Sequence, residues 1–130
     1  MTAPATPPPV RRVEVSARST DVFGRVLCSA RHHHFVIDGP ATNGCPGEAL
    51  TPPEAFLAAV ASCGVELVHV IARDTGEPLG RVAVSIEGVI DRSRQPREDV
   101  TVFSAVRLDF TLGGTDDAAA ARLIEGFKRR

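Results

Sequence analysis

The stretch TPPEAFLAAVASCGVELVHVIARDTG, residues 51–76, most limits how this chain can fold. It opens with a T-x-x-E capping box from Thr51 to Glu54, with proline in the first helical position, and it ends at Gly76. Between these signals the residues are apolar or small on almost every side. A helix of that kind is buried all round. The sequence therefore predicts one long, central, buried helix.

Burying that helix requires more surface than one small domain offers. The chain has 130 residues and only one other helical pattern, so a single copy can hardly surround it. Small side chains along the helix would let a second backbone come close; they are Ala58, Ala59, Ala61, Ser62 and Gly64. We therefore expect a homodimer whose core is shared between the two copies.

The rest of the chain predicts an α+β fold. We expect strands at 10–17, 22–30 and 34–38 before the long helix and at 81–90 and 99–114 after it. Thr115 and the two aspartates that follow open a last helix with an apolar side at Leu123, Ile124 and Phe127. The order is β-β-β-α-β-β-α in a single domain, residues 10–130, after a disordered proline-rich tail at 1–9.

Composition excludes several classes of protein. The net charge is −1 and there is no Trp or Tyr, so no nucleic-acid partner is expected. No uninterrupted apolar run reaches the roughly 18–20 residues of a membrane span, and no membrane partner is expected. The N-terminus lacks the charged and apolar regions of a secretion signal. Three cysteines do not form a disulfide framework, which indicates a reducing, cytoplasmic location.

Cys63, in the middle of the long helix, has two interpretations. On spacing alone it is a small buried hydrophobe, since free cysteine is among the most buried residue types. Glu54 likewise serves the capping box on spacing alone. The spacing of residues along the helix therefore does not by itself indicate a chemical role for Cys63 or Glu54.

A resemblance changes that balance. The run HHFVIDGPATNGCPGEALTPPEAFLAAVASC and the later RVAVSIEGVID resemble the OsmC/Ohr family of osmotically induced and organic hydroperoxide resistance proteins. The resemblance spans residues 10–130 and is most specific at the long helix. It implies an intertwined homodimer in which two central helices lie back to back, wrapped by sheets from both chains.

The resemblance also implies an activity, thiol-dependent reduction of organic hydroperoxides without a cofactor or metal. Cys63 matches the thiol that attacks the peroxide, Glu54 matches the glutamate at the helix start, and Arg18 is the best match for the activating arginine, with Arg25 second. Glu54 precedes Cys63 by nine residues where the family pattern has ten. An external dithiol would restore the thiol.

The family's second, resolving cysteine would lie beyond LIEGFKRR, where this sequence ends at Arg130. The final helix shows no closing residues, so we expect either that the natural protein continues or that it lacks this partner. Cys45, on the loop before the long helix, is the substitute within the chain. Cys28, on an expected strand, is interpreted as structural.

Two alternatives remain open. Cys28, His32 and His34 would share a face if the strand ran straight, and with Cys45 they would form a four-ligand zinc site, although the spacing matches no common zinc pattern. The second alternative is a non-catalytic dimer of the same fold that binds a small hydrophobic ligand at its interface. The missing resolving cysteine favours this alternative.

Overall fold

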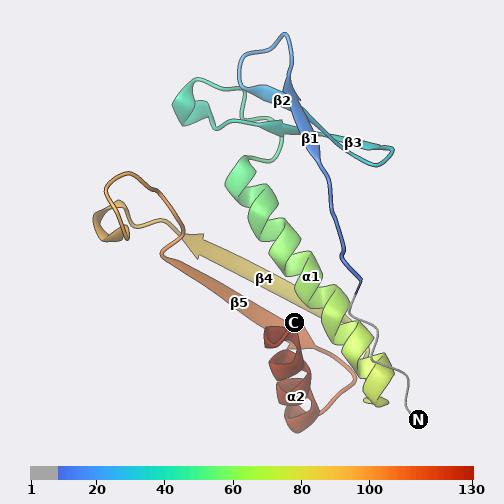
Figure 1. The fold of residues 1–130 in the computed structure, drawn as a ribbon. Coiled ribbons are helices and arrows are strands. Elements are labelled where there is room, and N and C mark those ends of the chain that lie inside the picture. Colours follow the sequence, from blue (N-terminus) through green and yellow to red (C-terminus); the bar gives the residue numbers. More distant parts are fainter. Residues whose placement is uncertain (1–8) are drawn as a thin grey trace, which may run out of the picture. The chain divides into compact units, whose positions relative to one another are not determined.

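The computed structural model of the chain describes residues 9–130. It divides into two compact units, one ending at Pro52 and the other running from Pro53 to Arg130, and each is described by itself. The expected tail at 1–9 lies, apart from Pro9, outside the described residues. The observed order of strands and long helices, β-β-β-α-β-β-α, confirms the predicted α+β class (Figure 1).

The N-terminal unit is an antiparallel meander of β1 (Ser16–Ser19), β2 (Arg25–Ala30) and β3 (His33–Asp38), in the order β1-β2-β3. The prediction of a first strand at 10–17 was wrong, because β1 begins only at Ser16. Val13 and Val15 alternate as a strand would, yet both are exposed, as is Val10. Alternation predicts a strand only where one face finds a surface to pack against.

The turn between β1 and β2 lies later than predicted. Residues 18–21 were expected to turn, but Arg18 and Ser19 pair with Leu27 and Val26, and the chain reverses over 20–24. The Thr20 hydroxyl donates to the Arg25 carbonyl at 2.9 Å and accepts from the Val22 N–H at 3.2 Å. These bonds from Thr20, together with the left-handed Gly24 (φ 77°), stabilise the reversal at the later position.

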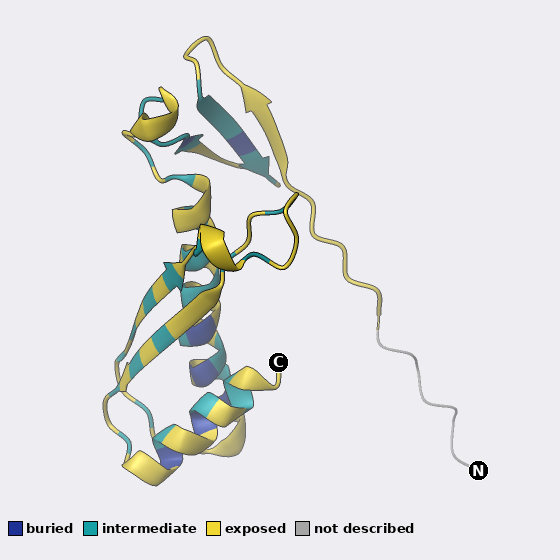
Figure 2. Ribbon diagram, turned by 90° about the vertical axis from the view of Figure 1, so that its left-hand side faces the viewer, coloured by how far each residue is buried: buried dark blue, intermediate teal, exposed yellow. Residues whose placement is uncertain are grey.

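The C-terminal unit packs α1 (Pro52–Thr75) and α2 (Asp117–Lys128) with the two-stranded sheet of β4 (Val82–Val89) and β5 (Ala105–Leu112) (Figure 1). Its core is Val68, Ile71 and Ala72 of α1 with Leu123 of α2. One face of the sheet turns toward this core, since alternate residues from Val82 onward and from Leu108 onward are the less exposed ones. Figure 2 shows the buried positions of this unit confined to the two helices.

The predicted helix ends are confirmed. Gly76 adopts φ 71°, and the Glu77 N–H reaches back to the Ala72 carbonyl at 3.0 Å, which closes α1 with a Schellman-type turn. The Asp116 carboxylate caps α2 by accepting from the Ala119 N–H at 2.7 Å. The expectation that the last helix has no closing residues was wrong, because the Arg129 N–H donates to the Gly126 carbonyl at 3.3 Å and the Arg130 N–H donates to the Phe127 carbonyl at 3.2 Å.

The predicted strand at 99–114 is shorter than expected. The Gln95 side chain donates to the Val102 carbonyl at 3.1 Å and accepts from the Val102 N–H at 2.7 Å. Both backbone groups of Val102 are therefore hydrogen-bonded to a side chain and not to the backbone of a neighbouring strand. Residues 90–104 instead form a connection that includes a short 3₁₀ turn, Arg92–Arg94, and β5 starts at Ala105.

Helix α1 leaves most of its apolar surface uncovered within the chain. By length and composition alone it could cross a membrane, with a mean hydropathy of 2.0, although polar residues interrupt every apolar run. Only 22% of the most apolar 18-residue stretch of this helix is buried within the chain. The buried part is the side that packs on α2 and the sheet, and the remainder is an open, largely apolar surface.

Candidate functional site

The thiol of the long helix lies in an apolar groove. Cys63 is exposed and helps to line a hollow of about 450 Å³. The walls come from one side of α1 and from the end of α2; they are Phe56, Ala59, Val60, Cys63, Leu67, Phe127, Lys128 and Arg130. Phe56, Val60, Cys63 and Leu67 follow one another at helical spacing along α1 and form one surface, which faces a space large enough for a small ligand. Ile71, the next residue at this spacing, lies in the core instead.

Gly64, next to Cys63, brings α2 close to the thiol. A Cβ at Gly64 would lie 3.1 Å from Cζ of Phe110 and 3.6 Å from Cζ of Phe127. The two rings meet edge to face with centroids 5.6 Å apart. Phe127 thus belongs both to the core and to the groove, and the missing side chain at position 64 is what lets it reach there.

Phe56, which also lines the groove, belongs to a second aromatic pair. Phe56 of α1 stacks on Phe103 at a centroid distance of 5.7 Å, and Phe56 is still 55% exposed. Gly88 of β4 makes room for this contact, since a Cβ there would meet the Phe103 ring at 2.5 Å. Phe56 and Phe127 therefore both line the groove together with the Cys63 thiol.

Glu54 lies on the same helix as Cys63 but not on the same side. Nine residues of α-helix turn through about 900°, which is two and a half turns, and advance about 13.5 Å. The Glu54 carboxylate therefore cannot touch the Cys63 sulfur of its own chain. Any influence of Glu54 on the thiol has to pass through a third group.

Arg18 lies on β1, opposite Leu27 of β2, and it is exposed. Within the described part of the chain it has no ion-pair partner, so its guanidinium is available. It shares a shallow hollow with Ser16, Leu27, Ser29 and His34. Arg18 belongs to the N-terminal unit and Cys63 to the C-terminal unit, and their meeting stays a prediction.

Arg25, the second choice for the activating arginine, is already engaged. Its guanidinium binds both carboxylate oxygens of Asp38, at 2.8 and 3.0 Å, and also reaches Glu48 at 3.3 Å. These hydrogen bonds and charges raise the pKa of Arg25 further above its usual value. An arginine held by two carboxylates is a poor partner for a thiolate in the same chain.

Asp38 is the residue that sequence reasoning missed. It is fully buried, and besides Arg25 it accepts from the backbone N–H groups of Glu48 and Ala49 at 3.0 and 2.9 Å. The bonds from Arg25, and then those from the two N–H groups, hold the pKa of Asp38 well below its usual range despite burial. The available signal was an aspartate ending an apolar strand immediately before a Gly-Pro loop.

The other two cysteines are more enclosed than Cys63. Cys28 is buried on β2, as predicted. Cys45 is half-buried, and its Sγ fills a notch between Gly24 and Gly39, where a Cβ at either glycine would collide with it. Both lie in the N-terminal unit, so Cys45 as a substitute resolving thiol stays a prediction.

The zinc alternative required one straight strand from Cys28 to His34, and that prediction was wrong. β2 ends at Ala30 and the chain reverses at Arg31, so Cys28 lies opposite Phe35 whereas His34 lies opposite Ser29. Neighbouring pairs of an antiparallel ladder face opposite sides of the sheet. His34 instead bonds Ser29 through Nδ1 at 2.8 Å. Residues 9–130 contain no group of three or more His, Cys, Asp or Glu side chains placed to hold a metal ion.

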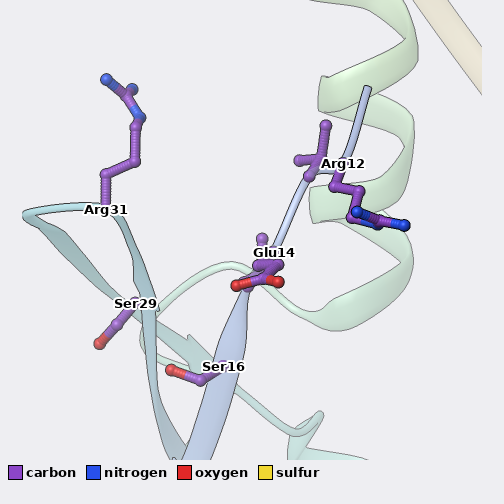
Figure 3. Close-up of a pocket in the computed structure, with 7 residues that line it drawn as sticks. Arg12, Glu14, Ser16, Ser29 and Arg31 are labelled. Atoms are coloured by element: carbon purple, nitrogen blue, oxygen red, sulfur yellow. The ribbon is translucent and has the colours of Figure 1, made fainter. Parts of the chain in front are cut away.

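A larger hollow, of about 920 Å³, lies in the N-terminal unit between residues 12–16 and the end of β2. Figure 3 shows Arg12 and Arg31 pointing away from one another, with Glu14, Ser16 and Ser29 between them. It contains no thiol, and its two cations do not converge. The groove at Cys63 is therefore the better candidate site.

Comparison with known proteins agrees with the fold. The family model described as OsmC-like protein matches residues 45–130. The OsmC-like protein from Mycoplasma pneumoniae superposes with a TM-score of 0.77 at 13% identity, covering 92% of this chain and 82% of that one. A comparison with curated proteins gives no match.

Two further solved structures are described as organic hydroperoxide resistance proteins. The one from Elizabethkingia anophelis has a TM-score of 0.73 at 14% identity, covering 93% of this chain and 84% of that one. The one from Legionella pneumophila has a TM-score of 0.71 at 16% identity, covering 94% and 85%. At such identities the likeness establishes the shared fold.

Proposed function

Because the chain belongs to the family of OsmC-like proteins, we propose that it is a thiol-dependent peroxidase that reduces organic hydroperoxides in oxidative stress defence. The observation that carries the proposal is the exposed Cys63 thiol in an apolar groove. Two solved proteins of this fold are named for resistance to organic hydroperoxides. An apolar groove favours an alkyl or fatty hydroperoxide over hydrogen peroxide.

The chemistry needs only the thiol and two external reactants. The Cys63 thiolate attacks the terminal oxygen of the hydroperoxide, forming an S–O bond as the O–O bond breaks. The sulfur is oxidised to a sulfenic acid, and the alkoxide that leaves takes a proton from water to become an alcohol. One thiol of an external dithiol then condenses with the sulfenic acid and releases water. Its second thiol breaks that mixed disulfide and restores Cys63.

Arg18 and Glu54 are the proposed assistants of the thiol. A guanidinium stabilises a thiolate in an apolar site, and Arg18 is the available cation of the first hairpin. Glu54 lies on the far side of α1 from Cys63, so its proposed role is to orient the Arg18 guanidinium without touching the sulfur. In a dimer these groups need not come from one chain. Cys45 remains the proposed substitute for the resolving thiol.

We also propose that the working form is a cytoplasmic homodimer. The side of α1 that includes Ala58 and Ser62 is exposed and small enough for a second helix to approach. Phe56, Val89 and Val106 add exposed apolar surface. A membrane is a poor alternative cover, because α1 packs against a two-stranded sheet with open edges, and open edges do not occur in hydrocarbon. Sedimentation should give twice 13.8 kDa.

The activity is tested by a brief pulse of cumene hydroperoxide to the reduced protein in the presence of a sulfenic-acid trap. Mass spectrometry should find the trap on Cys63, and Cys63→Ser should abolish the adduct. Cys45→Ser keeps Cys63 and removes the proposed resolving thiol, so the adduct should persist on Cys63 in equal or higher yield. A Cys45–Cys63 disulfide in untrapped protein would identify the resolving partner. A Cys63 that stays reduced in an intact dimer would contradict the proposal.

The second candidate is a non-catalytic dimer that binds a small hydrophobic ligand. What favours it is that residues 53–130 contain no cysteine besides Cys63, so no second thiol accompanies it in that unit. The same groove would then hold the ligand without reacting. A groove that binds alkyl ligands while Cys63 resists peroxide would support this candidate.

A further inference from the structure

Three polar side chains form a row across the N-terminal sheet. Ser16 of β1 pairs with Ser29 of β2, and Ser29 pairs with His34 of β3. Residues directly opposite each other in antiparallel strands share a face of the sheet, so the two hydroxyls and the imidazole are neighbours. Arg18, two residues after Ser16, is on the same face about 7 Å along the strand. All four side chains line one hollow of about 390 Å³.

The hydrogen bond within this row can change direction. The Ser29 hydroxyl and Nδ1 of His34 are 2.8 Å apart, and in a neutral imidazole with its proton on Nε2 the hydroxyl donates to Nδ1. Protonation of the imidazole turns Nδ1 into a donor, which frees the Ser29 proton for another acceptor. The protonated row and the Arg18 guanidinium then present donors and positive charge together. A negatively charged acceptor satisfies that arrangement.

The charges around the row also favour an anion. The two hollows that share the serines of the row are lined by three arginines and one carboxylate, namely Arg12, Arg18, Arg31 and Glu14. Within residues 9–130 none of these three guanidiniums lies in an ion pair. The Arg25–Asp38 pair is farther along the same face, and its two charges neutralise each other.

We infer that this face of the sheet binds the phosphate group of a small phosphate monoester through Arg18 and the three side chains of the row. A phosphate group has three acceptor oxygens and a charge of about −1.5 to −2, so it can use several donors at once. The larger hollow, of about 920 Å³, shares Ser16 and Ser29 with the first and receives the organic part of the ligand (Figure 3).

The inference goes beyond the proposed function, since the site contains no thiol and involves no step at sulfur. Arg18 is common to the two proposals, whereas Ser29 and His34 serve this site alone. Variants at Ser29 and His34 therefore test the phosphate site without altering the groups proposed to assist Cys63.

Binding is tested in the full-length Cys63→Ser protein at pH 7, with the ionic strength held constant by sodium chloride. Phenyl phosphate and inorganic phosphate are titrated separately while the ring-proton NMR signals of the histidines are followed. We expect a saturable shift of the His34 signals toward their protonated positions. Phenyl phosphate should bind more tightly than inorganic phosphate, because only the ester can also occupy the larger hollow.

Arg18→Gln, Ser29→Ala and His34→Gln should each weaken phenyl phosphate about two- to fivefold, the range of partly exposed charged contacts. Backbone amide signals of the three strands report binding in these variants. His33→Gln is the matched control, since His33 is the adjacent histidine and faces the other side of the sheet. It should leave the affinity unchanged.

Three results would overturn the inference: no saturable shift with either ligand, equal affinities for the two ligands, or equal losses in the His33 and His34 variants. Its failure is distinguishable from that of the proposed function. If phenyl phosphate binds through Ser29 and His34 but Cys63 resists cumene hydroperoxide, the inference stands and the peroxidase proposal falls. If Cys63 is oxidised but Ser29→Ala and His34→Gln leave the affinity for phenyl phosphate unchanged, the peroxidase proposal stands and the inference falls.

Discussion

Asp38 accepts hydrogen bonds from the Arg25 guanidinium with both carboxylate oxygens, Oδ1 from Nε at 2.8 Å and Oδ2 from Nη2 at 3.0 Å, across the β2–β3 pair. The same carboxylate accepts two N–H groups of the loop that leads toward α1. One buried anion therefore ties a strand, its neighbour and the following loop together.

This ion pair predicts an acid-sensitive N-terminal unit. The pKa of Asp38 is lowered in the folded chain, so its contribution to stability is complete above the unfolded pKa of about 3.9 and is lost as the pH falls toward the folded value. The Asp38→Asn variant should be less stable than the unchanged protein at pH 7, and its stability should fall less as the pH drops below 4. The midpoints of urea unfolding, measured from pH 2 to 7, test both expectations. Asp109→Asn, which alters an exposed pair with Arg107, is the control. Unchanged acid sensitivity in Asp38→Asn would contradict the prediction.

Two helix glycines should respond in opposite ways to alanine. Gly64→Ala places a methyl group 3.1 Å from the Phe110 ring, which Phe127 holds in place, and overpacking of this kind costs about 1–3 kcal/mol. Gly126→Ala meets only the flexible end of Ile71 and gains up to about 1 kcal/mol of helix propensity. Chemical denaturation should find the first variant destabilised and the second unchanged or stabilised. The reverse order would show that the Phe110 ring can yield.

The core of the C-terminal unit depends on Leu123. It is 1% exposed and packs with Val68, Ile71 and Ala72, so Leu123→Ala should cost about 2–5 kcal/mol. The comparison is Leu50→Ala, where the leucine is 52% exposed, and a smaller loss is expected. Urea unfolding of both variants measures the difference. Similar losses at the two positions would mean that Leu50 is covered in the assembled protein.

The notch around Cys45 predicts a coupled pair. Gly39→Ala would bring a Cβ to 2.5 Å from the Cys45 sulfur, so the variant should unfold at lower urea. Cys45→Gly removes the obstructing group, and the double variant should therefore lose less than the sum of the two single changes. A double-mutant cycle measures this coupling. If the two losses simply add, the destabilisation by Gly39→Ala does not come from a collision with Cys45.

The strength of local signals explains which parts of the fold were predictable. The T-x-x-E pattern from Thr51 to Glu54 and the left-handed Gly76 are signals that act within one turn of helix, so α1 was located by its own residues. The faces of β4 and β5 followed from alternation, because Phe110 and Leu112 had a core to enter. The same alternation misplaced the first strand, since Val13 and Val15 have nothing to cover them in the described chain.

The candidate site likewise has features that the sequence determines and features that only the tertiary structure decides. Residue order by itself determined that Cys63 lies mid-helix on one stripe with Phe56, Val60 and Leu67, because 3.6 residues per turn fix the side on which each residue lies. It also implied, by simple counting, that Glu54 faces away from that stripe. Only the tertiary structure decided that Phe127, Lys128 and Arg130 of α2 close the groove and that Asp38 occupies Arg25. Those contacts join residues far apart in the chain, and no local pattern of charge or hydrophobicity specifies which distant side chains will meet.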